Sequence, residues 1–172
     1  MKLRTDWTKV PKDVIDEITK LKGFETYMGF TRYYKIRGKL DKDRFEDFSS
    51  NCKILCELVS RKWGINIGGP DGDGGEPTFS KESVEFNGID EDSHESFILD
   101  LNSNGFNFTK TQLKPYDKHV EACLILAKYY FGDTIEVSSD GSDEIDSEIE
   151  ILTKESIRNF KISEILDKNS NI

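Results

Sequence analysis

Apolar residues recur along this chain with two different periods, and the longest regular pattern lies between residues 41 and 63. Its apolar positions are three or four residues apart, as on one face of an α-helix, and are Phe45, Phe48, Cys52, Leu55 and Val59. A second pattern, over residues 114–130, has a proline near its start and is apolar nearly all round. We therefore predict two helices here and expect the second to be the most buried element.

Two further helices are predicted near the ends of the chain. Pro11 suits a first helical position and Gly23 a C-terminal cap, so a helix is expected over residues 10–23. The last apolar positions, from Leu152 to Ile165, predict a helix that docks on the body. The chain then divides into an N-terminal helix (1–24), a core domain (25–141) and an acidic linker with a C-terminal helix (142–172).

Strand-forming residues lie between these helices. β-Branched and aromatic residues gather, or alternate with polar ones, in five segments, which are 29–40, 65–67, 84–86, 96–101 and 134–137. The resulting order is α-β-α-β-β-β-α-β-α. It predicts an α+β fold with a single mixed sheet of about five strands covered by helices.

Length and composition indicate a soluble protein with one main core. The chain has 172 residues, of which 35% are hydrophobic and 33% charged. No apolar run approaches the roughly 18 residues of a membrane span, and the first residues lack the apolar stretch of a signal peptide. Three cysteines without a secretory signal argue against a disulfide framework. We therefore expect a cytoplasmic protein that does not bind membranes.

Charge is distributed unevenly along the chain. The net charge is −9, yet residues 1–40 carry ten Lys and Arg against five Asp and Glu. Sequence-independent binding of nucleic acid requires clustered Lys and Arg that neutralise phosphates. The acidic remainder of the chain argues against nucleic acid as the principal ligand, while the basic first part leaves a specific contact open.

The densest cluster of glycines lies between Ile67 and Pro77. Five of the thirteen glycines occur there, Gly68, Gly69, Gly72, Gly74 and Gly75, together with the carboxylates Asp71, Asp73 and Glu76. So many glycines do not form the interior of a strand or helix, because each costs backbone entropy there. The pattern predicts a tight loop whose backbone approaches another group closely.

The predicted topology brings this loop near two other segments. If strands 96–101 and 134–137 are joined through the helix 114–130, they run parallel and end at one sheet edge. Backbone N–H groups in a glycine loop and at a helix N-terminus favour anionic oxygen. We therefore predict a ligand-binding edge formed by Gly72, Asp73, Gly74, Gly75, Glu76, Lys114, Tyr116, Asp117, Ser138, Ser139 and Asp140.

Several metal or catalytic sites are conceivable, and each has a simpler structural alternative. Asp71-Gly72-Asp73-Gly74 has the spacing that opens a calcium loop, but the distal glutamate is missing. Cys52, Cys56, His119 and Cys123 could meet as zinc ligands if their helices pack together, although core cysteines are favoured. The acidic run 138–150 is either a solvated linker or an electrostatic mimic of nucleic acid.

Five short motifs occur in order along the core domain. They are Gly72-Asp73-Gly74-Gly75-Glu76-Pro77, Phe86-Asn87-Gly88, His94-Glu95-Ser96-Phe97, Lys114-Pro115-Tyr116-Asp117 and Val137-Ser138-Ser139-Asp140-Gly141. In this order they resemble a family of uncharacterised proteins from tailed bacteriophages and some bacteria, over roughly residues 30–141. The resemblance implies a phage-type origin and the cytoplasm of an infected bacterial host. It implies no activity.

Three functions remain open on these grounds. The leading hypothesis is a non-enzymatic interaction protein that binds a host or phage macromolecule, or sequesters a small anionic, nucleotide-like ligand, at the predicted edge. The alternative is a metal-dependent phosphoester hydrolase, with Asp71, Asp73, Glu76 and Asp140 as ligands and Lys114 neutralising developing charge. The third is a structural virion component. Apart from a divalent cation in the second hypothesis, no cofactor is expected.

Overall fold

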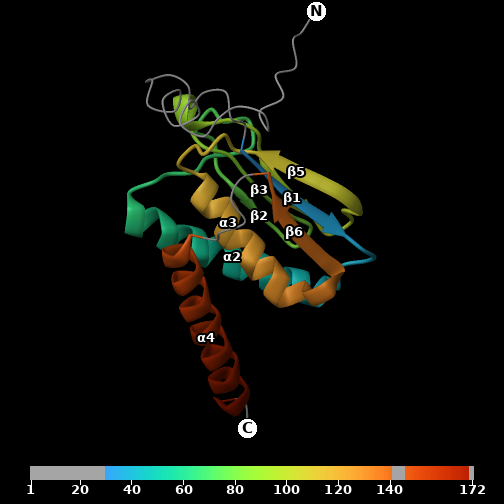
Figure 1. Ribbon diagram of the computed structural model, residues 1–172. Helices are drawn as coiled ribbons and strands as arrows, with labels where there is room; N and C mark the ends of the chain where they lie inside the picture. The colour runs from blue at the N-terminus through green and yellow to red at the C-terminus, as the bar shows by residue number, and fades with distance from the viewer. Residues whose placement is uncertain (1–29, 141–145, 171–172) are drawn as a thin grey trace, which may run out of the picture.

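The computed structural model describes residues 30–140 and 146–170, with side chains described up to residue 167. The helix predicted over residues 10–23 and the domain boundary at residue 24 lie outside these residues. The described elements are β1 (Thr31–Ile36), α2 (Lys42–Trp63), β2 (Thr78–Phe79), β3 (Ser83–Phe86), β4 (Phe97–Asp100), β5 (Gly105–Lys110), α3 (Asp117–Phe131), β6 (Ile135–Ser139) and α4 (Ser147–Ser170), with short 3-10 turns at Asp90–Asp92 and Gly132–Thr134 (Figure 1).

The predicted α+β class is confirmed, but the single mixed sheet is wrong. The strands form two three-stranded sheets, ordered β5-β1-β6 and β2-β3-β4, and every pairing is antiparallel. The predicted parallel pair 96–101 and 134–137 lies in two different sheets. The segment 65–67 is not a strand; only a bridge between Gly68 and Asn87 follows it.

Strand β5, which the sequence pattern did not identify, accounts for this difference. Its inward-facing positions are polar, Asn107 and Thr109, while its aromatic residues Phe106 and Phe108 face solvent. An amphipathic strand normally shows the opposite arrangement. Strand β5 pairs with one edge of β1, and β6 pairs with the other, so β4 belongs to the second sheet instead of the sheet that contains β6.

Helix α2 forms as its sequence pattern predicts. The Asp41 carboxylate accepts a hydrogen bond from the Arg44 N–H at 2.9 Å, which caps the N-terminus. Gly64 ends the helix in the left-handed conformation, with φ of 67°. The predicted stripe is fully buried, with side chains of Phe45, Phe48, Cys52, Leu55 and Val59 in the core.

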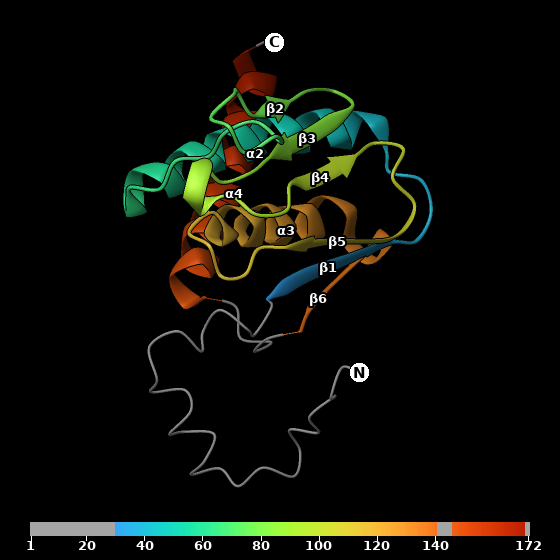
Figure 2. The same cartoon turned by 90° about the horizontal axis from the view of Figure 1, so that it is seen from above.

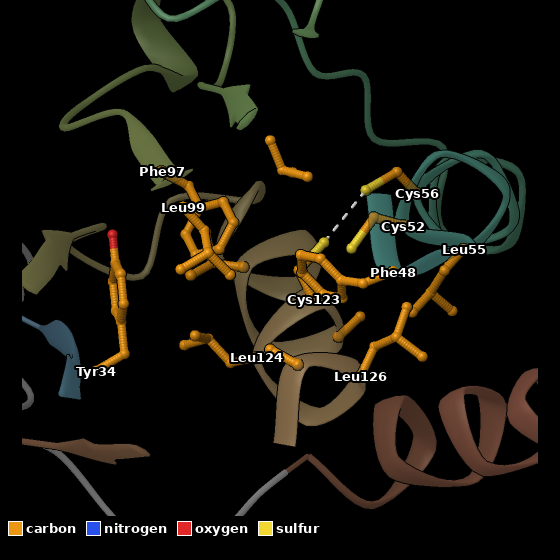
Figure 3. Packing of buried hydrophobic residues seen from close by; sticks show 14 of the residues in the cluster. Tyr34, Phe48, Cys52, Leu55, Cys56, Phe97, Leu99, Cys123, Leu124 and Leu126 are labelled. Carbon is orange, nitrogen blue, oxygen red and sulfur yellow. Dashed lines mark hydrogen bonds between the residues drawn. The ribbon is translucent and has the colours of Figure 1, made fainter. Parts of the chain in front are cut away.

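The core lies between the two sheets and the helices α2 and α3. Helix α3 contacts β1 and β6, whereas α2 contacts β2 and β3, and the two helices pack on each other (Figure 2). The Tyr34 hydroxyl of β1 donates to the Ile98 carbonyl of β4 at 2.6 Å, which ties one sheet to the other. As expected, α3 is the most buried helix, and its Cys123 faces Cys52 and Cys56 of α2 (Figure 3).

The C-terminal helix α4 is docked over only part of its length. Ile149, Thr153 and Ser156 are buried against the body, where α4 contacts α3 and α2, while residues 161–167 are exposed. The helix then projects from the body (Figure 1). Among the described helices, none is long and apolar enough to cross a membrane.

Candidate functional site

Two of the three segments predicted to converge do meet at one end of the sheet β5-β1-β6. Both β5 and β6 run antiparallel to β1, so their last residues lie beside its first ones: Lys110 pairs with Thr31, and Ser139 with Arg32. The start of α3 and the end of β6 therefore share this end of the sheet. They do so through β5, not through the predicted pairing of residues 96–101.

Asp140 follows β6 and holds the start of β1. Its Oδ1 accepts a hydrogen bond from the Thr31 N–H at 2.7 Å, and its Oδ2 accepts one from the Tyr33 hydroxyl at 3.1 Å. Both oxygens of this predicted ligand thus serve a structural contact. Ser138, on β6 opposite Tyr33, is exposed on the outer side of the sheet.

Asp117, in the first turn of α3, is buried in a network of polar side chains. Its carboxylate forms an ion pair with Arg32 at 2.7 Å and accepts a hydrogen bond from the Thr111 hydroxyl at 2.7 Å. Arg32 also lies 3.2 Å from Glu121, whose pKa is raised chiefly by burial, with Arg32 opposing that effect. The network joins β1 to α3 and compensates the helix N-terminus with a protein carboxylate.

The two remaining residues at the start of α3 hold the loop that precedes β4. The buried Tyr116 hydroxyl donates to the Glu95 carbonyl at 2.6 Å, and burial raises its pKa. The Lys114 ammonium donates to the Glu91 carbonyl. Both polar groups therefore position residues 91–95, and the loop 91–95 lies between α3 and the glycine loop.

The glycine loop (residues 68–77) packs against itself and against residues 87–93. A Cβ atom added to Gly68 would lie 3.1 Å from the Gly74 Cα, and one added to Gly72 would lie 2.8 Å from the Ser93 Cβ. Gly72 also has φ of 73°, which only glycine adopts without strain. The expected close approach is real, and the group approached is the protein's own backbone.

Hydrogen bonds inside the protein occupy the N–H groups of four of the five glycines in this loop. The N–H of Gly68 donates to the Asn87 carbonyl, that of Gly69 to Gly75, and that of Gly72 to Gly69. The Gly75 N–H donates to the Asp73 carboxylate at 3.1 Å. Asn87 anchors the other side by donating to the carbonyls of Pro70 and His94. The glycine N–H groups on which the predicted anion site depended are therefore mostly engaged within the protein.

Glu76 borders a pocket. The pocket has a volume of about 420 Å³ and lies between α2 and the end of the glycine loop. Lys53 and Arg61 line it together with the carboxylates Glu57 and Glu76, so its charge is mixed. Neither Asp117 nor Asp140 is among the described residues that line this pocket.

Of the predicted metal ligands, Asp71, Asp73 and Glu76 lie along the glycine loop, where Asp71 is exposed, and Asp140 follows β6. Asp73 caps the glycine loop, Asp140 holds β1, and Glu76 faces the pocket beside α2. In residues 30–140 and 146–170, no group of three or more His, Cys, Asp or Glu side chains is placed to hold a metal ion.

The three cysteines come together between α2 and α3, but His119 does not join them as the zinc hypothesis required. The sulfur atoms of Cys56 and Cys123 are 3.5 Å apart, and burial raises the pKa of the Cys52 and Cys56 thiols (Figure 3). The Nε2 atom of His119 lies 3.0 Å from the Ser60 hydroxyl instead of from a sulfur, and burial lowers its pKa to about 4. The cluster is part of the hydrophobic core.

The acidic run near the C-terminus is partly paired. Asp146 lies 2.6 Å from Lys118, which lowers its pKa, and its N–H donates to Glu121. Glu148 lies 3.3 Å from Lys62, and Glu150 lies 2.7 Å from Lys154. The contacts of Asp146 and Glu148 connect the start of α4 to α3 and α2, whereas the Glu150 pair lies within α4.

The structure presents a surface that the sequence patterns did not reveal. We call it the aromatic face: the outer face of sheet β5-β1-β6, on the side opposite α3. Its rings are Tyr33, Phe106 and Phe108; the Phe106 and Phe108 side chains are 63% and 53% exposed. The ring centroids of Tyr33 and Phe106 are 5.5 Å apart, and those of Phe106 and Phe108 are 6.3 Å apart. The alternation of Phe106, Asn107, Phe108 and Thr109 was the available signal for this strand.

Comparison with known proteins adds no relative to this description. No protein-family model matches the chain, and neither the curated proteins nor the solved structures contain a match to it.

Proposed function

We propose that this chain is a non-enzymatic, phage-type interaction protein that binds a macromolecule through the aromatic face. The observation that carries the proposal is the exposure of Phe106 and Phe108, 63% and 53%, side by side on one strand. Large aromatic side chains that remain open to solvent in a cluster mark binding surfaces, because covering them with a partner releases the burial energy that folding leaves unused.

The support for this surface is stronger than the support for the predicted edge. At that edge the polar groups of Tyr116, Asp117 and Asp140 are engaged in contacts that hold the fold together. On the aromatic face, by contrast, the rings of β5 contribute little to the core. The polar network under the sheet fixes β1, and β1 in turn fixes the position of the rings.

The proposal concerns binding because the described residues offer no assembled set of catalytic groups. Of the carboxylates that a metal-dependent hydrolase would use, Asp71, Asp73 and Glu76 lie along the glycine loop and Asp140 follows β6, and among the described residues they form no group of three placed to hold a metal ion. A binding protein needs only a preorganised surface, and two paired strands with a helix behind them supply one.

The test compares partners captured by three full-length proteins from lysate of the bacterial host. The proteins are the wild type, the double variant Phe106→Ser/Phe108→Ser, and the control Tyr129→Ser, which changes an exposed aromatic residue on α3. We expect a partner that the wild type and the control retain and the double variant loses. Equal capture by all three proteins would contradict the assignment of this face.

A further inference from the structure

We infer that the macromolecule on the aromatic face is a single strand of nucleic acid, whose bases stack on the rings and whose phosphates lie beside the lysines. The inference rests on the proposed function and identifies its ligand.

The arrangement of the rings is the first reason. Tyr33 and Phe106 stack with an angle of 28° between their planes, and Phe106 and Phe108 follow at 36°. They come from two adjacent antiparallel strands and stand on one side of the sheet, where residues two apart are separated by about 6.8 Å. Unpaired bases stack on such rings whatever their sequence, because every base has a π-face.

The charge beside the rings is the second reason. In the register of the sheet, Lys35 lies opposite Phe106, and Lys110 follows Phe108 on the same face. The carboxylate of Glu136 faces the same way but forms an ion pair with Arg37. A second carboxylate, that of Asp140, lies at the Tyr33 hydroxyl. The positive side chains beside the rings, Lys35, Arg37 and Lys110, still outnumber these two carboxylates, so the aromatic face is locally basic in a chain of net charge −9. The acidic total made nucleic acid an unexpected ligand, but contacts with phosphate depend on the charge at the surface itself.

The neighbours of the rings distinguish nucleic acid from a protein partner. The other outward positions of the three strands are occupied by Thr31, Lys35, Lys110, Glu136 and Ser138. None of them is aliphatic. The centre of a protein interface is depleted in lysine, and it is more apolar than this surface. Rings interleaved with lysines suit a ligand that alternates flat bases with phosphates.

The same geometry excludes a double helix as the ligand. In a duplex the faces of the bases are covered by their neighbours, so rings on a flat sheet cannot reach them. The face carries few groups that could read a 2′-hydroxyl, because the Tyr33 hydroxyl already donates to Asp140. We therefore expect DNA and RNA strands of the same sequence to bind alike.

The experiment measures fluorescence anisotropy of labelled 12-nucleotide oligo(dT) and oligo(rU) with the full-length protein at several salt concentrations. A 12-base-pair duplex serves as the negative probe. We expect binding of both single strands and none of the duplex. Phe106→Ala and Phe108→Ala should each weaken binding roughly 5- to 150-fold, the effect of losing one stacked base. Tyr129→Ala should leave binding unchanged, and a thermal melt confirms that each variant is folded.

Two conservative variants separate stacking and charge from a structural effect. Tyr33→Phe keeps the ring and removes only the hydroxyl, so binding should persist, whereas Tyr33→Leu should reduce it. Lys35→Gln should lower the steepness of the salt dependence by about 0.7 in log Kd per log salt, the value for one phosphate contact on a single strand.

The inference is overturned if neither single strand binds, if the duplex binds as well as they do, or if Phe106→Ala and Tyr129→Ala behave alike. A protein captured only when Phe106 and Phe108 are intact, without oligonucleotide binding, would overturn it while leaving the proposed function in place. Self-association that depends on Phe106, without oligonucleotide binding, would instead identify a second copy of this chain as the occupant and overturn the inference.

Discussion

Arg32 and Asp117 form a two-point contact that fixes the first turn of α3 on β1. The Arg32 Nε atom donates to Asp117 Oδ1 at 3.1 Å, and Nη2 donates to Oδ2 at 2.7 Å. Both side chains are only 11% exposed. Parallel hydrogen bonds between a guanidinium and a carboxylate fix orientation as well as distance. Tyr33 follows Arg32 in the chain, so the Arg32–Asp117 contact also holds the backbone that carries the Tyr33 ring of the aromatic face.

Asp117→Asn should destabilise the protein by about 2 kcal/mol, because it weakens two charge-assisted hydrogen bonds to the buried Arg32 guanidinium, which keeps Glu121 as its other carboxylate. Urea denaturation followed by circular dichroism measures the free energy of unfolding. The control is Glu136→Gln, which breaks the Arg37 pair between side chains that are 57% and 58% exposed. That change should cost less than about 1 kcal/mol. Equal costs would contradict the structural role of the buried pair.

Tyr34→Phe should lower the free energy of unfolding by about 1 to 2 kcal/mol, because it removes the hydrogen bond that joins the two sheets. The buried Tyr34 hydroxyl is bonded to the Ile98 carbonyl at 2.6 Å. Tyr33→Phe is the matched change one position away, where the hydroxyl is exposed. If thermal denaturation shows the same loss for both variants, the sheets are not held together at Tyr34.

The buried imidazole of His119 should make stability depend on pH. Its pKa falls from the ordinary 6.5 to about 4 in the folded protein, mainly through burial. The unfolded chain therefore binds a proton that the folded protein excludes. Above about pH 6.5 His119 should not lower the free energy of unfolding. Between about pH 6.5 and 4 that free energy should fall as the pH falls, by at most about 1.4 kcal/mol per pH unit.

The histidine variants assign this pH dependence. His119→Asn removes the titrating group, so urea midpoints between pH 4.5 and 7 should become flatter than in the wild type. His94→Asn changes the chain's other histidine and should keep the wild-type slope. A slope that survives in His119→Asn would assign the effect to other groups.

Gly88→Ala should prevent folding or cost at least about 3 kcal/mol, because backbone as well as side chains would have to move. A Cβ atom at this position would lie 2.0 Å from the Asp92 carbonyl oxygen. Gly75→Ala is the control, since its Cβ would lie 3.3 Å from the end of the flexible Asp73 side chain. Soluble yield and urea midpoints of the two variants test the difference.

The sequence pattern was enough to predict an element wherever its buried positions recur with the period of a helix or a strand. The stripe from Phe45 to Val59 predicted α2 within a residue, and the capping residues Asp41 and Gly64 lie at its ends. The glycine loop was likewise recognised as a close approach of backbone, although what it approaches, residues 87–93, was not.

The candidate site was predictable only in part, because its segments are brought together by the pairing of strands that are far apart in the sequence. The sequence identified the start of α3 and the end of β6 as unusual, and the structure brings them to one end of the sheet. It gave no indication of the aromatic face. On β5 the aromatic residues point outward and the polar residues point inward. This is the reverse of the alternation by which a strand packed on a core is recognised.

The sequence by itself determined the class of fold, the two central helices and most strands, since these depend on periodicity and capping within about twenty residues. Only the tertiary structure decided that β1 lies between β5 and β6, through contacts such as Thr31 with Asp140, 109 residues apart. That placement gathers Tyr33, Phe106 and Phe108 on one open surface. Strand order depends on which distant edges pair, and no local pattern specifies that choice.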